Sequence, residues 1–297
     1  MKGNKSMKSI DKNFNEIDKS LKVEEVIGYI KSNLKNMNID STILEYTLSN
    51  FDNLLMQATD DDSYSIKLPN STLKENKILS NVGALKANMQ VSVDSKELNI
   101  IPGIVTRKNY SVHQLIHEIF HGISSRQHNY FDENGITYTK TGTKINYYDS
   151  TLNNYEKIDN LSSDGLNEGI TELLTSILLN EYNGNYAQFV VISYLFMNNN
   201  NLLLNAYFMN DISGMEKFYK DVSEKQSLIT REDFINLDSK CFDFELIAKI
   251  ITAGIEYNKS YGKEITNEEL NFLINYLDNY LILDSGSWHD LIASFTK

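Results

Sequence analysis

Proline is almost absent from this chain, and its placement limits the fold more than any other sequence feature. The 297 residues include two prolines, Pro69 and Pro102, so none follows position 102. Proline is the residue that most strongly breaks a helix. The rest of the chain can therefore be largely helical, and apolar spacing predicts helices within residues 12–58, at 164–180 and repeatedly up to residue 297.

The segment before the second proline has a different pattern. Residues 65–68 and 89–93 alternate apolar and polar side chains, which predicts strands, and residues 89–101 predict a hairpin that ends at Pro102-Gly103. Residues 129–160 have no sustained period and predict a long irregular segment with room for short strands. The expected class is α+β, with an N-terminal helical segment at 1–60, a part with a small mixed or antiparallel sheet at 61–182 and a helical part at 183–297.

Charge and cysteine content exclude several kinds of site. The formal charge of -12 and the pI near 4.9 argue against nucleic-acid binding, which needs clustered Lys and Arg. The single cysteine, Cys241, excludes an intramolecular disulfide, and with no basic helper next to it we expect it to be inert. Neither a secretory signal nor an apolar run of the ~20 residues that span a bilayer is present, so the expected location is cytoplasmic.

The segment His117-Glu118-Ile119-Phe120-His121 carries the chemistry. Ser111 and Gln114 form a predicted capping box, so a helix should run from about 111 to 125. Residues four apart share one helix face, and His117 and His121 can therefore bind one metal ion. Glu118 would then flank the open coordination position as a general base for a metal-bound water.

A catalytic zinc needs a third protein ligand, and Glu168 is the preferred candidate. It stands near the start of the helix predicted from 164, and Glu172 lies four residues later on the same face. Glu172 would accept a hydrogen bond from the outer N–H of one ligand histidine. His128 and Asp164 are weaker alternatives for the third ligand.

These residues resemble the thermolysin-like gluzincins, which pair HExxH on one helix with Asn-Glu-x-x-x-acid on the next. The resemblance covers two helical segments, and Glu168 follows His121 by 47 positions, more than in thermolysin. It implies a zincin-like catalytic domain at 61–182, one zinc ion and a peptide or protein substrate. It also implies an edge strand, for which the 89–101 hairpin is the candidate, and a donor to the tetrahedral oxyanion, for which Tyr148, Tyr155 and His289 are candidates.

Alternative interpretations of the same residues differ in what they require. Metzincins place Gly and His three and six residues after the second histidine, where this chain has Ser124 and Gln127. His113, one turn before His117, could support a ligand, contact substrate or pack in the core, and core packing is preferred. The predicted function is zinc-dependent peptide hydrolysis. The alternatives are a catalytically silent zincin-fold protein that binds a protein partner and a helical protein whose motif is incidental; the oligomeric state stays open.

Overall fold

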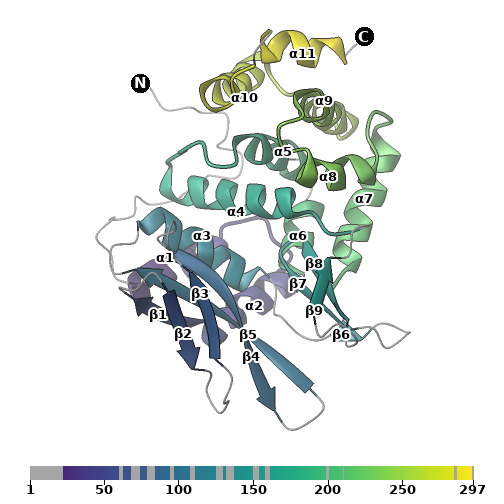
Figure 1. The fold of residues 1–297 in the computed structure, drawn as a ribbon. Coiled ribbons are helices and arrows are strands. Elements are labelled where there is room, and N and C mark those ends of the chain that lie inside the picture. Colours follow the sequence, from purple (N-terminus) through teal and green to yellow (C-terminus); the bar gives the residue numbers. More distant parts are fainter. Residues whose placement is uncertain are drawn as a thin grey trace.

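The computed structural model describes residues 23–59, 63–67, 74–78, 84–93, 97–107, 111–124, 130–131, 137–149, 154–157, 161–198, 201–209, 211–283 and 286–295. Within these ranges the chain forms eleven α-helices and three small sheets, in agreement with the predicted α+β class (Figure 1). No helix in the described ranges is long and apolar enough to cross a membrane.

Two helices precede the first strand, as the apolar spacing of residues 12–58 predicted. They are α1 (Val23–Leu34) and α2 (Ser41–Asn50), and a 3-10 turn at Phe51–Asn53 follows. The Asp40 carboxylate caps α2 by accepting hydrogen bonds from the backbone N–H groups of Thr42 and Ile43. Both helices pack against the later helix that carries the two histidines.

The predicted hairpin is present and is longer than expected. Its strands, β4 (Ala84–Val93) and β5 (Glu97–Arg107), pair antiparallel, and β1 (Leu55–Thr59) runs parallel to β5, giving the order β1-β5-β4. Among the described residues β4 is an outer strand of this sheet. The strand predicted at 65–68 is β2 (Ser63–Lys67), which pairs with β3 (Lys74–Ile78).

The expectation that the hairpin ends at Pro102-Gly103 is wrong, because β5 continues to Arg107. Pro102 lies opposite Asn88 of β4, and the pairing of β5 with β1 begins one residue later, at Gly103. On the β1 side no partner strand therefore requires the N–H that proline lacks. The proline marks the place where β5 gains its second neighbour.

Residues 129–160, predicted to be largely irregular, contain a four-stranded antiparallel meander. Its strands are β6 (Tyr130–Phe131), β7 (Thr137–Thr141), β8 (Lys144–Asp149) and β9 (Asn154–Lys157). A two-residue turn of Gly142 and Thr143 joins β7 to β8, and Gly142 has a φ of 57°, a conformation that glycine adopts without strain. These Tyr- and Thr-rich strands have the composition of a sheet without a simple alternation of apolar residues.

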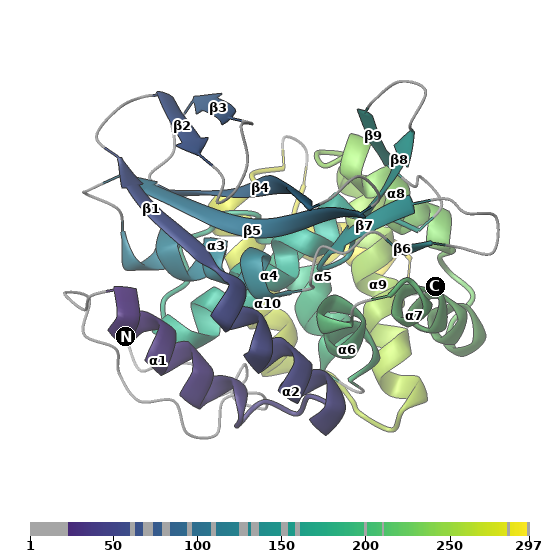
Figure 2. The same ribbon diagram turned by 90° about the horizontal axis from the view of Figure 1, so that it is seen from below.

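The remaining elements of the described residues are helices. They are α3 (Val112–Ile123), α4 (Asp164–Leu179), α5 (Ala187–Met197), α6 (Leu202–Phe208), α7 (Ser213–Lys225), α8 (Arg231–Ser239), α9 (Phe244–Ser260), α10 (Asn267–Tyr280) and α11 (Trp288–Ser294). Figure 1 shows α3 between the β4–β5 hairpin and α4, with α5 beyond α4. Figure 2 shows the hairpin on one side of α3 and the helices α1 and α2 on the other.

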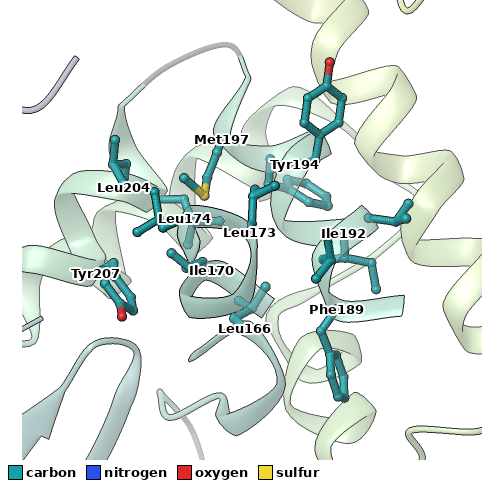
Figure 3. Packing of buried hydrophobic residues seen from close by; sticks show 14 of the residues in the cluster. Leu166, Ile170, Leu173, Leu174, Phe189, Ile192, Tyr194, Met197, Leu204 and Tyr207 are labelled. Carbon is teal, nitrogen blue, oxygen red and sulfur yellow. The ribbon is translucent and has the colours of Figure 1, made fainter. Parts of the chain in front are cut away.

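The core is centred on α4 and α5. Every residue of α5 is buried, as expected for a helix that is apolar on all sides. Leu166, Ile170 and Leu173 of α4 belong to the same cluster of buried apolar residues as Phe189 and Ile192 of α5 (Figure 3). One cluster of buried apolar residues extends from α1 to α11, so α4 is fixed between the histidine helix and the C-terminal helices.

Candidate metal centre

Helix α3 places the two motif histidines on one buried face. Ser111 and Gln114 form the predicted capping box, so the first turn is fixed just before the motif. His117 and His121 are 8% and 7% exposed, and their Nε2 atoms lie 3.1 Å apart. Two imidazole nitrogens that face each other across this distance can bind the same metal ion.

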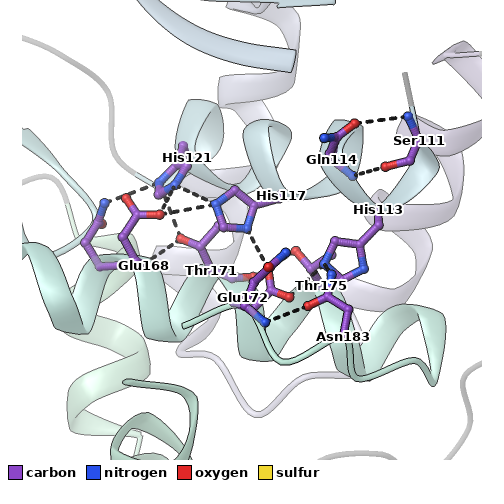
Figure 4. Close-up of polar contacts among 12 residues, drawn as sticks. Ser111, His113, Gln114, His117, His121, Glu168, Thr171, Glu172, Thr175 and Asn183 are labelled. Carbon is purple, nitrogen blue, oxygen red and sulfur yellow. Dashed lines mark hydrogen bonds and ion pairs between the residues drawn. The ribbon is translucent and has the colours of Figure 1, made fainter. Parts of the chain in front are cut away.

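Helix α4 brings the predicted third group to the same point. The Ser163 hydroxyl accepts a hydrogen bond from the backbone N–H of Leu166, and α4 starts at Asp164 as predicted. One carboxylate oxygen of Glu168, Oε2, lies 3.3 Å from Nε2 of His117 and 3.3 Å from Nε2 of His121 (Figure 4). All three ligand atoms lie within 4.8 Å of one another, close enough to hold a metal ion.

The charges of these side chains are strongly coupled. Burial alone would lower the pKa of His117, but hydrogen bonds with Glu168 and Glu172 and the nearby charge of Glu118 raise it to about 10. Burial would raise the pKa of Glu168, yet the two histidines hold it well below its usual range. The negative charges of the carboxylates therefore favour a cation at this point, either a proton on His117 or a metal ion.

Glu172 is the hydrogen-bond partner that the sequence predicted for a ligand histidine. It is 1% exposed, and its Oε2 lies 2.9 Å from Nδ1 of His117. Its other oxygen, Oε1, lies 2.8 Å from Nε2 of His113. The preferred interpretation of His113 as a core-packing residue is therefore wrong, because its ring is a hydrogen-bond partner of the Glu172 carboxylate. Asn183, on the α4–α5 connection, contacts the same His113 nitrogen at 3.0 Å.

The outer nitrogen of His121 has different neighbours, which the sequence analysis missed. Asn167 Nδ2 lies 3.3 Å and Thr171 Oγ1 3.4 Å from His121 Nδ1. The Tyr207 hydroxyl lies 2.7 Å from Thr171 Oγ1. Helical spacing places Asn167 and Thr171 on the face of α4 near Glu168, but no local pattern connects Tyr207 of α6 to this position.

Tyr186, also missed, lies over His117 of the candidate metal-ligand group. Its ring stacks on His117 with a centroid distance of 6.0 Å and an interplanar angle of 16°. The residue as a whole is 43% exposed, but partial burial of its hydroxyl, the charges of Glu168 and Glu118 and a hydrogen bond with Glu168 raise the hydroxyl pKa to about 12. Its φ of 55° is rare for an aromatic residue and costs about 1–3 kcal/mol, which indicates that the surrounding structure holds it in place.

The three predicted candidates for an oxyanion donor lie elsewhere or are described by backbone alone. Tyr148 and Tyr155 are paired opposite each other in β8 and β9. His289, on α11, has its Nε2 2.9 Å from Oδ1 of Asn271 on α10. Figure 1 shows α4 and α5 between α11 and α3, so His289 is not near the motif histidines. Among residues whose side chains are described, Tyr186 is the tyrosine that stacks on a ligand histidine.

Of the other residues singled out from the sequence, Glu118 lies beside the candidate ligands and Asp164 does not. Glu118 is half-buried on α3, next to His117, and its charge also raises the pKa of the Tyr186 hydroxyl. Asp164 lies 3.2 Å from the Lys144 ammonium and is not in the ligand group. His128 falls outside the described residues, and Cys241 is half-buried.

No protein-family model, curated protein or solved structure matches this chain. Function is therefore inferred from the geometry and chemistry of the site.

Proposed function

We propose that this chain is a zinc-dependent peptidase of the gluzincin type, with His117, His121 and Glu168 as metal ligands and Glu118 as general base. The observation that carries the proposal is the convergence of His117 Nε2, His121 Nε2 and Glu168 Oε2 on one point. Glu118 projects from the helix that carries both histidines. Short motifs occur by chance, but chance does not bring a carboxylate from 47 positions away to both ring nitrogens.

Zinc is the ion that this donor set fits best. Two imidazoles and one carboxylate are a common set of protein ligands for catalytic zinc, whereas Ca²⁺ and Mg²⁺ prefer oxygen ligands alone. Glu168 is 29% exposed, so the group is accessible from one side. A structural zinc site is usually closed by four protein ligands, and the described residues contribute three.

The side chains around the ligands have the roles that amide hydrolysis requires. A bound zinc ion would supply a water of pKa about 7 and polarise a carbonyl. Glu118 would take a proton from the attacking water and pass it to the leaving amine. The Tyr186 hydroxyl, kept protonated by its raised pKa, would donate to the oxygen on which negative charge develops. The outer strand β4 offers an edge along which an extended peptide could pair.

The proposal is tested with Glu118→Gln, which keeps the size of the side chain and removes the base. The zinc-loaded variant should retain one equivalent of zinc and lose at least about a hundredfold in kcat toward a peptide library. Glu256→Gln, an exposed glutamate on α9, is the matched control and should behave as the original protein does. Full peptide hydrolysis by Glu118→Gln, or no cleavage by the zinc-loaded original protein, would show the proposal to be wrong.

A further inference from the structure

A buried lysine outside the ligand group ties together two segments near His121. Lys140, in β7, is 0% exposed. Its ammonium donates hydrogen bonds to the carbonyl of Gly142, to the carbonyl of Ala206 at 2.7 Å and to that of Met209 at 2.9 Å. Burial lowers the pKa of Lys140 to about 7, although the charge of Asp211 acts in the opposite direction, and the carbonyl acceptors satisfy its buried N–H groups.

The carbonyls that Lys140 binds belong to two separate elements. Ala206 and Met209 lie at the C-terminal end of α6, where backbone carbonyls lack partners within the helix and attract positive charge. Gly142 begins the turn between β7 and β8. Helix α6 has seven residues, too few to be stable alone in water, so its position depends on such tertiary contacts. Lys140 thus fixes α6 relative to the β7–β8 turn.

Helix α6 supplies the first of two contacts that reach His121. The Tyr207 hydroxyl meets Thr171 Oγ1 at 2.7 Å, and Thr171 donates its own proton to the Asn167 carbonyl at 2.7 Å. A hydroxyl has one proton and two lone pairs, so Thr171 can then accept from both Tyr207 and His121 Nδ1–H. This arrangement favours the tautomer that leaves His121 Nε2 free to bind a metal ion.

The β7–β8 turn supplies the second contact. The backbone N–H of Thr143 donates to Oδ1 of Asn167 at 3.2 Å, which directs the amide nitrogen toward His121 Nδ1. A Cβ atom at Gly142 would lie 2.0 Å from Asn167 Oδ1 and 2.7 Å from the Tyr207 ring. The turn therefore packs against both Asn167 and Tyr207.

Thr171 and Asn167 compete for the same ring nitrogen. An amide N–H directed at Nδ1 favours the tautomer with its proton on Nε2, which cannot bind a metal ion. A Thr171 hydroxyl that turned its proton to Nδ1 would have the same effect. A proton donated by Tyr207 to Thr171 Oγ1 would oppose that rotation, because the Thr171 proton then stays directed at the Asn167 carbonyl.

We propose that Tyr207, held in place by Lys140, is a positioning residue that sets the tautomer and orientation of His121. The inference rests on the proposed metal site and adds a support from α6 and β7. It differs from the support of His117, where a carboxylate accepts from Nδ1 directly. The predicted consequence is that metal affinity depends on two residues that do not contact the metal ligands themselves.

The test measures zinc affinity by competition with a chromophoric chelator, using zinc alone as the probe. Tyr207→Phe should bind zinc about 10–100 times more weakly, the usual effect of losing a supporting hydrogen bond. Tyr257→Phe is the matched control, since Tyr257 is also fully buried and donates to Asp221, which keeps Tyr261 as a partner. It should change zinc affinity by less than about twofold. Lys140→Met should weaken zinc binding in the same direction as Tyr207→Phe.

A second pair of variants separates positioning from packing. Thr171→Val keeps the shape and removes the hydroxyl, and it should weaken zinc binding as Tyr207→Phe does, whereas Thr171→Ser should restore affinity. Nitrogen-15 NMR of the metal-free protein should show more of the Nε2–H tautomer of His121 in Tyr207→Phe. Unchanged zinc affinity and tautomer in folded Tyr207→Phe would overturn the inference while the proposed function stands. Failure of the original protein to bind zinc would overturn both.

Discussion

Binding of zinc to protein stripped of metal is expected to release about one proton per ion, and that proton comes from His117. The ring of His117 lies between Glu168 and Glu172, whose hydrogen bonds raise its pKa to about 10 in the absence of metal. An imidazole must be neutral to bind zinc. At pH 7 zinc therefore has to displace a proton that the two carboxylates hold.

The size of the effect follows from the shifted pKa. With a pKa of about 10, roughly one molecule in a thousand has a neutral His117 at pH 7, so zinc affinity is lowered about a thousandfold from its limit. Affinity should rise about tenfold for each pH unit from 7 to 9. A histidine with its ordinary pKa near 6.5 would be mostly neutral over this range and would itself add almost nothing to the slope.

Isothermal titration calorimetry in buffers of different ionisation enthalpy measures the number of protons released, and chelator competition gives the affinity at each pH. His289→Gln is the control, because this exposed histidine on α11 should contribute nothing to the slope. Zinc affinity that stays constant between pH 7 and 9, with no proton released, would refute the assigned charge state of His117.

The same shifts determine how the stability of metal-free protein varies with pH. The folded-state pKa of His117 is raised, so its stabilising contribution is complete below the unfolded value of 6.5 and is lost as pH rises through about 10. The folded-state pKa values of Glu168 and Glu172 are lowered, so their contributions are present above 4.5 and are lost as pH falls through those folded values. All of these contributions are present together between about pH 4.5 and 6.5, where metal-free protein should therefore be most stable.

Three substitutions test other parts of the site. Tyr186→Phe should keep the ring stacked on His117 and keep zinc bound, yet lower kcat about a hundredfold with little change in KM, as steady-state kinetics would show; an unchanged kcat would remove the donor role. Glu172→Gln should weaken zinc binding about 10–100-fold by chelator competition, because a neutral amide replaces the acceptor that His117 and His113 share. Gly169→Ala should lower the free energy of unfolding in urea by about 1–3 kcal/mol, because its Cβ would lie 2.4 Å from the Phe189 carbonyl oxygen; Gly28→Ala, with open space around it, should be neutral or stabilising.

The candidate ligand group of His117, His121 and Glu168 could be predicted because its signals are local. The Ser111 and Gln114 capping box fixes where α3 starts, and the spacing of four fixes the common face of His117 and His121. Glu168 was identified from a second short pattern on an equally regular helix. Both helices obey rules that depend on a few neighbouring residues, so their boundaries and faces follow from sequence.

The residues that were missed depend on contacts between distant segments. Tyr186 is placed by a left-handed backbone conformation, which its own side chain disfavours and which no local pattern signals. Tyr207 contacts Thr171, which lies 36 positions earlier in the sequence. It is carried by α6, and a helix of seven residues is too short for its sequence pattern to predict which way it faces. The meander of β6–β9 was hidden for a related reason, since its strands gain stability from pairing with one another.

The unequal support of the two histidines has an electrostatic consequence. With a divalent ion bound, Glu118, Glu168 and Glu172 give the site a formal charge of about -1, and a fourth carboxylate behind His121 would make it about -2. Each added carboxylate raises the basicity of a ligand and makes the ion a weaker electrophile. Neutral Thr171 accepts from His121 without that cost, but a neutral acceptor holds a ring less strongly than a charged one does. Tyr207, which Lys140 of β7 holds in place, adds support for His121, and Tyr207 lies on α6, beyond the predicted boundary at residue 183. Substitution of Tyr207 by Phe should therefore weaken zinc binding even though all three proposed ligands lie before α6 in the sequence.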